Sequence, residues 1–188
     1  QIQHYLKKNK TVYSIDLPLH GLNTDSGFWD IKSFYDYGKA IKESFELIQG
    51  KVSVICHSTG CVGVLDLLLG TDTYQEKNFG ITKNSSIAEK LNKLYLLAPL
   101  VRVKFHPLLK IAANVAPIES IPRKTNPKSK RLRELRELDP ASTQHIPLSW
   151  FAEYAEWEKK REWQSNAFKG FLVFDPKDSV VDVSYAKK

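Results

Sequence analysis

The chain has 188 residues, and its 28 lysines and arginines outnumber its 21 aspartates and glutamates, which gives a formal net charge of +7. Apolar residues make up 42% of the sequence and charged residues 26%, and these proportions exclude a disordered polymer, a collagen-like fibre and a coiled coil. No apolar run approaches the ~20 residues of a membrane-spanning helix, and the length suits one domain with its own core.

Strands and helices are predicted to alternate along most of the chain. Clusters of β-branched, aromatic and other apolar residues predict strands at residues 11–17, 51–56, 94–97 and 171–174. Helices are predicted at residues 35–48 and 62–69, where apolar residues form a stripe or a continuous run that a glycine ends. This order is typical of an α/β fold, so we expect a mostly parallel sheet with helices on both faces.

A proline-rich stretch separates the third and fourth predicted strands. It is about seventy residues long, and a structureless loop of that length is rare, so we expect an inserted helical cap. Three of the four tryptophans lie in this stretch. The predicted divisions are the first part of an α/β core at 1–100, the cap at 101–167 and the continuation of the core at 168–188.

The two cysteines, Cys56 and Cys61, are too few to stabilise a chain of this size by disulfides. They also lack the further ligands that a zinc site requires. We expect two buried, reduced thiols in a reducing compartment, the cytoplasm. A disulfide between them is the less favoured alternative, because both cysteines lie in one strand–turn–helix unit.

Residues 56–60 (CHSTG) lie directly between a predicted strand and a predicted helix. This context is typical of a nucleophile elbow, G-x-S-x-G, in which a strained turn exposes the serine hydroxyl. Ser58 is therefore the candidate nucleophile, and we expect Cys56 and Gly60 to be pressed together around it. The backbone N–H of Thr59 and the start of the following helix would stabilise an oxyanion. The alternative is that the S-x-G tripeptide has no function, but the flanking strand and helix favour the elbow.

Five stretches resemble the α/β-hydrolase superfamily, most closely serine hydrolases of the monoacylglycerol lipase, lysophospholipase and serine aminopeptidase type. They are YSIDLPLHG at 13–21, CHSTGC at 56–61, LYLLAP at 94–99, the proline-rich insert, and GFLVFDPKDSVVD at 170–182. The family usually spells the second as G-H-S-x-G-G, so this chain has cysteines at two glycine positions. The resemblance implies an α/β-hydrolase fold whose insert is the lid.

The resemblance also implies that Asp178 is the acid of a Ser–Asp–His triad, because Val180 and Val181 follow it as the family pattern requires. The alternative for Asp178 is a turn former or helix cap. Asp175 and Asp182 are expected to be structural, the first ending the strand and the second capping a helix.

No histidine follows Asp178, although the family places its catalytic base after the acid. All five histidines precede it: His4, His20, His57, His106 and His145. The resemblance implies that the base lies beyond Lys188 and that a second oxyanion donor precedes Gln1. The absence of Met agrees with a missing N-terminus, and we expect the chain, truncated at both ends, to hydrolyse nothing efficiently alone.

Lysine and arginine are concentrated at residues 123–136, within the predicted lid. One interpretation is a solvated helix with Glu–Arg pairs. The other is a surface that binds anionic membranes and raises the local substrate concentration. Nucleic-acid binding is not expected, because no aromatic residue or recognition motif accompanies the basic residues.

The sequence thus predicts an enzyme that hydrolyses a carboxylic ester, with a monoacylglycerol- or lysophospholipid-like lipid as substrate. Ser58 would attack the carbonyl, the Thr59 N–H would bind the oxyanion, and Asp178 would orient the histidine. No metal or organic cofactor is required. A peptidase or thioesterase would use the same triad, and a non-catalytic, hydrolase-like binding module is the alternative from another class.

Overall fold

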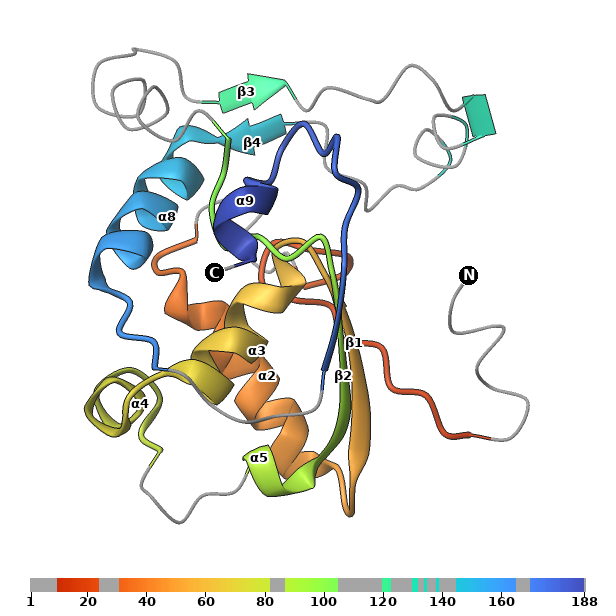
Figure 1. The fold of residues 1–188 in the computed structure, drawn as a ribbon, viewed down its shortest axis with the longest axis vertical. Helices are drawn as coiled ribbons and strands as arrows, with labels where there is room; N and C mark the ends of the chain where they lie inside the picture. The colour runs from red at the N-terminus through yellow and green to blue at the C-terminus, as the bar shows by residue number, and fades with distance from the viewer. Residues whose placement is uncertain are drawn as a thin grey trace.

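The computed structural model of the protein describes residues 10–23, 31–81, 87–104, 120–122, 130–131, 134, 138, 145–164 and 170–187. The helices and strands are, in chain order, α2 (Tyr35–Leu47), β1 (Val52–His57), α3 (Gly60–Leu69), α4 (Asp72–Phe79), α5 (Ile87–Lys90), β2 (Leu91–Leu97), β3 (Ser120–Pro122), β4 (His145–Pro147), α8 (Leu148–Lys160), β5 (Gly170–Val173) and α9 (Val183–Ala186) (Figure 1).

Three parallel strands form the main sheet, in the order β1–β2–β5. His57 pairs with Leu97, and Leu97 pairs with Val173, so the three strands end at the same edge. The predicted α/β architecture with a parallel sheet is confirmed in the described residues, and the predictions near 51–56, 94–97 and 171–174 all fall on its strands.

The strand predicted at 11–17 is wrong. These residues carry no strand, and Tyr13 and Ile15 are exposed. A strand forms only where its backbone groups pair with a neighbouring strand. In the part of the chain that the structure describes, no strand runs beside this segment, so its β-forming composition is not enough.

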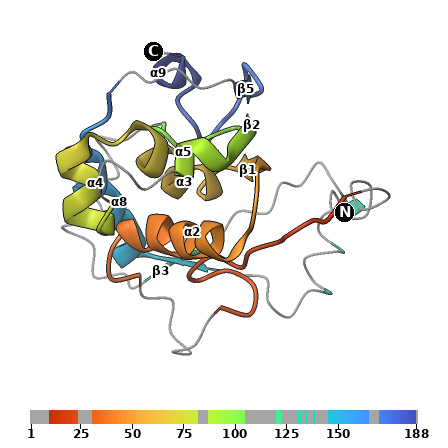
Figure 2. The same cartoon turned by 90° about the horizontal axis from the view of Figure 1, so that it is seen from below.

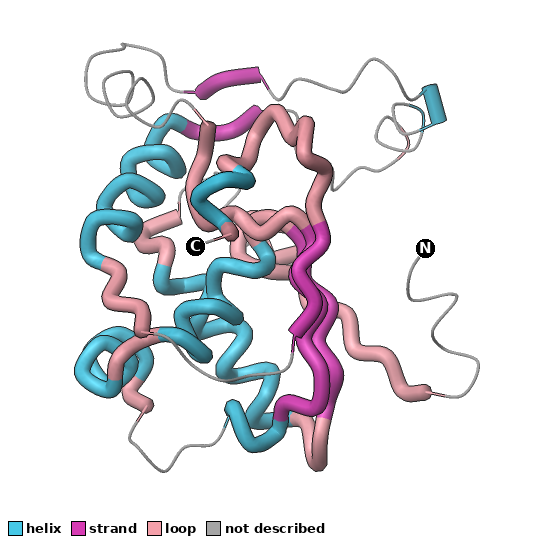
Figure 3. The backbone as a smooth tube through the Cα atoms, in the orientation of Figure 1, coloured by secondary structure: helices cyan, strands magenta, loops and turns pink. Residues whose placement is uncertain are grey.

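The described helices cover one face of the sheet (Figures 1 and 2). Cys56, Leu94 and Leu96 point to that face and are buried in the same apolar cluster as residues of α2 and α3. On the opposite face the side chains of Ile55, Phe171 and Val173 are exposed. We expected helices on both faces, but the described helices cover only one face of the described sheet (Figure 3).

Helices α2 and α3 correspond to the two predicted helices, and they pack in close contact. An added Cβ at Gly63 in α3 would lie 2.6 Å from the carbonyl carbon of Tyr37 in α2. Such a distance is too short for any real Cβ contact, so the glycine lets the two backbones approach. All but the first and last residues of α3 are buried, because the sheet and the neighbouring helices surround this helix.

Helix α8 lies within the predicted cap and carries two of its three tryptophans, Trp150 and Trp157. Its Tyr154 and Trp157 are buried and pack with Phe34, which precedes α2. Strand β4 directly precedes α8, and it pairs antiparallel with β3. The basic segment at 123–136 lies outside the described residues except for its positions 130, 131 and 134. The division of the chain into core and cap stays a prediction.

None of the helices that the structure describes is long and apolar enough to cross a membrane.

Candidate active site

Ser58 lies in the turn between β1 and α3 with a φ of +51°. This left-handed region is strained for a residue with a Cβ, and such strain concentrates at functional sites. The neighbouring strand exit holds the residue in place: the Ser58 N–H donates to the Leu97 carbonyl at 3.0 Å, and the Ser58 carbonyl accepts from the Leu100 N–H at 3.2 Å. The serine thus occupies a tight strand-to-helix turn, half-buried.

Thr59 is the residue between Ser58 and the first residue of α3. Its carbonyl accepts a hydrogen bond from Val62 at 3.0 Å, which starts the helix. Among the described residues, its own N–H has no hydrogen-bond acceptor. A free N–H at the positive end of a helix dipole can stabilise a developing oxyanion beside the serine.

Asp178 follows β5 in a tight turn, with its N–H bonded to the Asp175 carbonyl at 2.9 Å. Its Oδ1 accepts from the N–H groups of Val180 and Val181, at 2.7 and 2.8 Å, which fixes the carboxylate. The other oxygen, Oδ2, accepts no hydrogen bond from the residues that the structure describes. One carboxylate oxygen is therefore oriented by the backbone, and the other is available to a donor.

Asp182 has the capping role expected from the sequence, whereas Asp175 lies two residues after the end of β5 and does not end the strand. Asp182 caps α9 by accepting from the Tyr185 N–H at 3.0 Å. The Oδ1 of Asp175 accepts from the Lys177 N–H at 2.8 Å, which stabilises the turn after β5.

The structure brings Ser58 and Asp178 to one edge of the sheet without joining them. Ser58 follows β1 and Asp178 follows β5, and parallel strands present their carboxyl ends at the same edge. Strand β2 lies between them, and no hydrogen bond links the two side chains in the described structure.

Neither described histidine ring bonds to Ser58 or Asp178. His57 ends β1 and is exposed, whereas His20 contacts the Pro18 carbonyl at 2.9 Å and meets the Tyr37 ring edge-on. His4 and His106 lie outside the described residues, and only the backbone of His145 is described. The described part of the chain therefore contains no base bonded to the candidate nucleophile.

Cys56 and Cys61 are free and buried, and their burial is as expected. A hydrogen bond with Cys61 and burial raise the pKa of the Cys56 thiol. The tight contact expected at Gly60 is absent, because an added Cβ there would meet its nearest neighbour, Leu17 Cδ1, at an ordinary 3.6 Å. In the part of the chain that is described, no three His, Cys, Asp or Glu side chains gather to hold a metal ion.

Sequence reasoning missed Asp66, whose carboxylate is fully buried in the core. Its Oδ1 accepts from Tyr74 Oη at 2.9 Å and from Trp163 Nε1 at 2.8 Å, and its Oδ2 accepts from Trp157 Nε1 at 2.8 Å. Burial raises the pKa of Asp66 to about 6, although these three donors and Arg161 act in the opposite direction. A signal was present, since Asp66 is the only charged residue in the apolar run VGVLDLLL.

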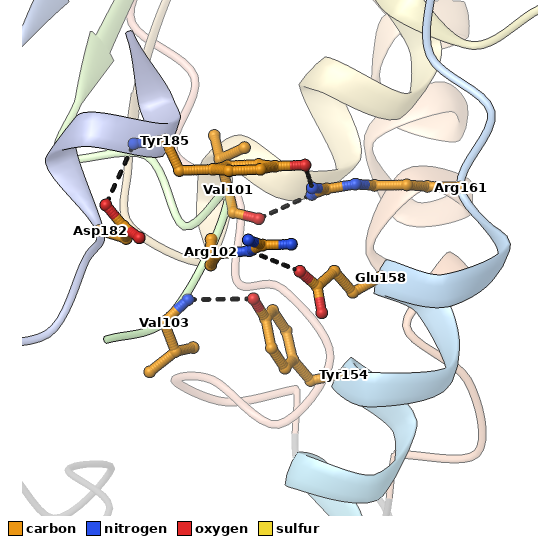
Figure 4. A network of polar contacts seen from close by, with 8 residues as sticks. All are labelled: Val101, Arg102, Val103, Tyr154, Glu158, Arg161, Asp182 and Tyr185. Atoms are coloured by element: carbon orange, nitrogen blue, oxygen red, sulfur yellow. Dashed lines mark hydrogen bonds and ion pairs between the residues drawn. The ribbon is translucent and has the colours of Figure 1, made fainter. Parts of the chain in front are cut away.

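A second polar network joins α8 to the segment after β2 and to α9 (Figure 4). Arg161 donates to the Val101 carbonyl at 2.6 Å and to Tyr185 Oη at 2.8 Å. Arg102 donates to Glu158 in α8 at 2.9 Å, and its guanidinium lies 3.9 Å from the centre of the Tyr185 ring. The edge of the sheet that carries Asp178 is thus tied to α8.

Comparison with known proteins gives one structural likeness. No protein-family model matches the chain, and a search of curated proteins finds no match. A crystal structure of the monoacylglycerol lipase of Paleococcus ferrophilus aligns with 77% of this chain at 17% sequence identity and a TM-score of 0.46. The chain spans 55% of the length of that lipase.

Proposed function

We propose that this chain carries the nucleophile and the acid of a serine hydrolase with an α/β-hydrolase fold, and that the enzyme cleaves a carboxylic ester. The observation that carries the proposal is the backbone of Ser58. A serine with φ of +51°, directly between a parallel strand and a buried helix, matches the turn that exposes a nucleophilic hydroxyl. Among the described residues, the adjacent Thr59 N–H is free to bind the oxyanion.

In this reaction Ser58 Oγ attacks the ester carbonyl and transfers its proton to a histidine. The carbonyl oxygen becomes an oxyanion beside the Thr59 N–H, and the protonated histidine then gives its proton to the leaving alcohol. Asp178 accepts the histidine N–H through Oδ2 and stabilises the positive charge. The histidine belongs to a part of the protein outside the described residues.

The proposed substrate is a monoacylglycerol- or lysophospholipid-like ester, and the support for it is the motif resemblance together with the basic segment at 123–136. A lid segment rich in lysine and arginine would favour an anionic lipid surface. We place the reaction in a reducing compartment, the cytoplasm, because Cys56 and Cys61 are free thiols.

A non-catalytic binding module is the second candidate. It is favoured by one observation: neither His20 nor His57 bonds to Ser58 or Asp178. Such a module would keep the strained turn and have no nucleophilic reactivity.

Labelling of the full-length protein with a fluorophosphonate distinguishes the two candidates. We expect the wild type to label and Ser58→Ala to remain unlabelled. Ser53→Ala, which removes an exposed hydroxyl from the same strand, should label like the wild type. Thr59→Ala should also label, because it retains the backbone N–H. Failure of the folded wild type to label or to hydrolyse p-nitrophenyl esters would favour the binding module.

A further inference from the structure

Lys104 contacts the loop of Asp178 at two points. Its backbone N–H donates to the Val180 carbonyl at 2.8 Å, and its side-chain Nζ donates to the carbonyl oxygen of Asp178 itself. The lysine lies in the segment that follows β2, so both contacts reach from the central strand to the turn after β5.

The residues on either side of these contacts form a short antiparallel ladder. Val103 bridges Val181, and the Asp182 N–H donates to the Arg102 carbonyl at 2.8 Å. Val180 and Val181 are also the two residues whose N–H groups hold Asp178 Oδ1. The ladder that Lys104 completes thus contains the donors that orient the carboxylate.

The loop that carries Asp178 needs such an anchor because β5 alone holds it weakly. All four residues of β5 are exposed, and in the described sheet β5 pairs with β2 alone. An edge strand with exposed side chains and a single neighbouring strand does little to hold the loop that follows it in one position. By contrast, an ammonium bonded to a carbonyl is a charge-assisted hydrogen bond, stronger than a neutral one.

We propose that Lys104 is a positioning residue for Asp178: its ammonium fixes the Asp178 carbonyl and thereby keeps Oδ2 directed at the catalytic histidine. The role in catalysis rests on the proposed function, whereas the anchoring of the loop does not. The hydrogen bonds of Lys104 that the structure describes go to the loop of Asp178, so we expect its removal to act on turnover rather than on substrate binding.

Amide hydrogen exchange tests the anchoring in the full-length protein without reference to activity. Lys104→Met keeps the apolar stem and removes the ammonium. We expect the Val180 and Val181 amides to exchange about tenfold faster in this variant. Lys177→Met is the matched control, because Lys177 lies exposed in the same loop and, among the residues that the structure describes, bonds only through its backbone. Unchanged exchange in Lys104→Met would overturn the proposal.

Hydrolysis of a p-nitrophenyl ester tests the consequence for catalysis, with kcat expressed per Ser58 titrated by fluorophosphonate so that any unfolded fraction is excluded. We expect kcat of Lys104→Met to fall about tenfold with KM unchanged, because only the acid is displaced. Lys104→Arg should recover most of the loss, and Lys177→Met should match the wild type. Faster exchange with an unchanged kcat would refute the positioning role, whereas an inactive wild type with faster exchange in Lys104→Met would refute only the proposed function.

Discussion

Replacing Asp66 with asparagine removes a buried negative charge while keeping the shape of the side chain. Burial raises the pKa of Asp66 to about 6, compared with about 3.9 for an aspartate in an unfolded chain. Between these two values the folded protein keeps a proton that the unfolded chain has released. The free energy of unfolding therefore falls as the pH rises through this range.

Two pKa units correspond to about 3 kcal/mol of unfolding free energy. The stabilisation is fully present below about pH 4 and is lost as the pH rises through about 6. Urea titrations followed by the fluorescence of Trp157 and Trp163, the two indoles bonded to Asp66, measure the effect at each pH. The difference in unfolding free energy between wild type and Asp66→Asn should shift by about 3 kcal/mol against the wild type from pH 4 to pH 7.

Tyr74→Phe provides a control of opposite sign. The Tyr74 hydroxyl lowers the pKa of Asp66 by donating to its carboxylate, so its removal should steepen the pH dependence. The reasoning is refuted if the wild type and Asp66→Asn lose stability in parallel, to within about 0.5 kcal/mol, across this range.

Two further predictions concern α3 and the turn before it. Gly63→Ala should lower the free energy of unfolding by about 1–3 kcal/mol, because its Cβ would overlap the backbone of Tyr37, whereas Gly60→Ala should change it by less than about 1 kcal/mol. Urea titration checks both, and equal effects would contradict the packing described. The Cys56 thiol should react with a disulfide reagent at pH 8 far more slowly in the folded protein than in urea, since burial and Cys61 raise its pKa. Rapid reaction of the folded protein would show that the thiol is accessible.

The features that could be predicted best from the sequence are those that a local pattern of residues determines. The strands of the sheet and helices α2 and α3 follow from apolar runs of the right period, and the turn at Ser58 follows from a motif between two of them. The segment at 11–17 has a similar composition and forms no strand, because pairing depends on a neighbour that the segment's own residues do not specify.

Contacts between distant residues could not be predicted in this way. The indoles of Trp157 and Trp163 reach Asp66 from 91 and 97 residues away, and Lys104 reaches Asp178 across 74. A carboxylate within an apolar run shows that some partner must exist, since a buried charge requires one. It does not identify the partner, because only the folded chain brings the two segments together.

The turn that carries Ser58 depends on a second strand. Its unusual backbone is fixed by Leu97 and Leu100, which lie at the exit of β2 and not within the CHSTG segment. Transplanting those five residues into another parallel sheet would therefore leave the serine free to relax to an ordinary conformation. A successful graft has to include both strand exits and the register between them.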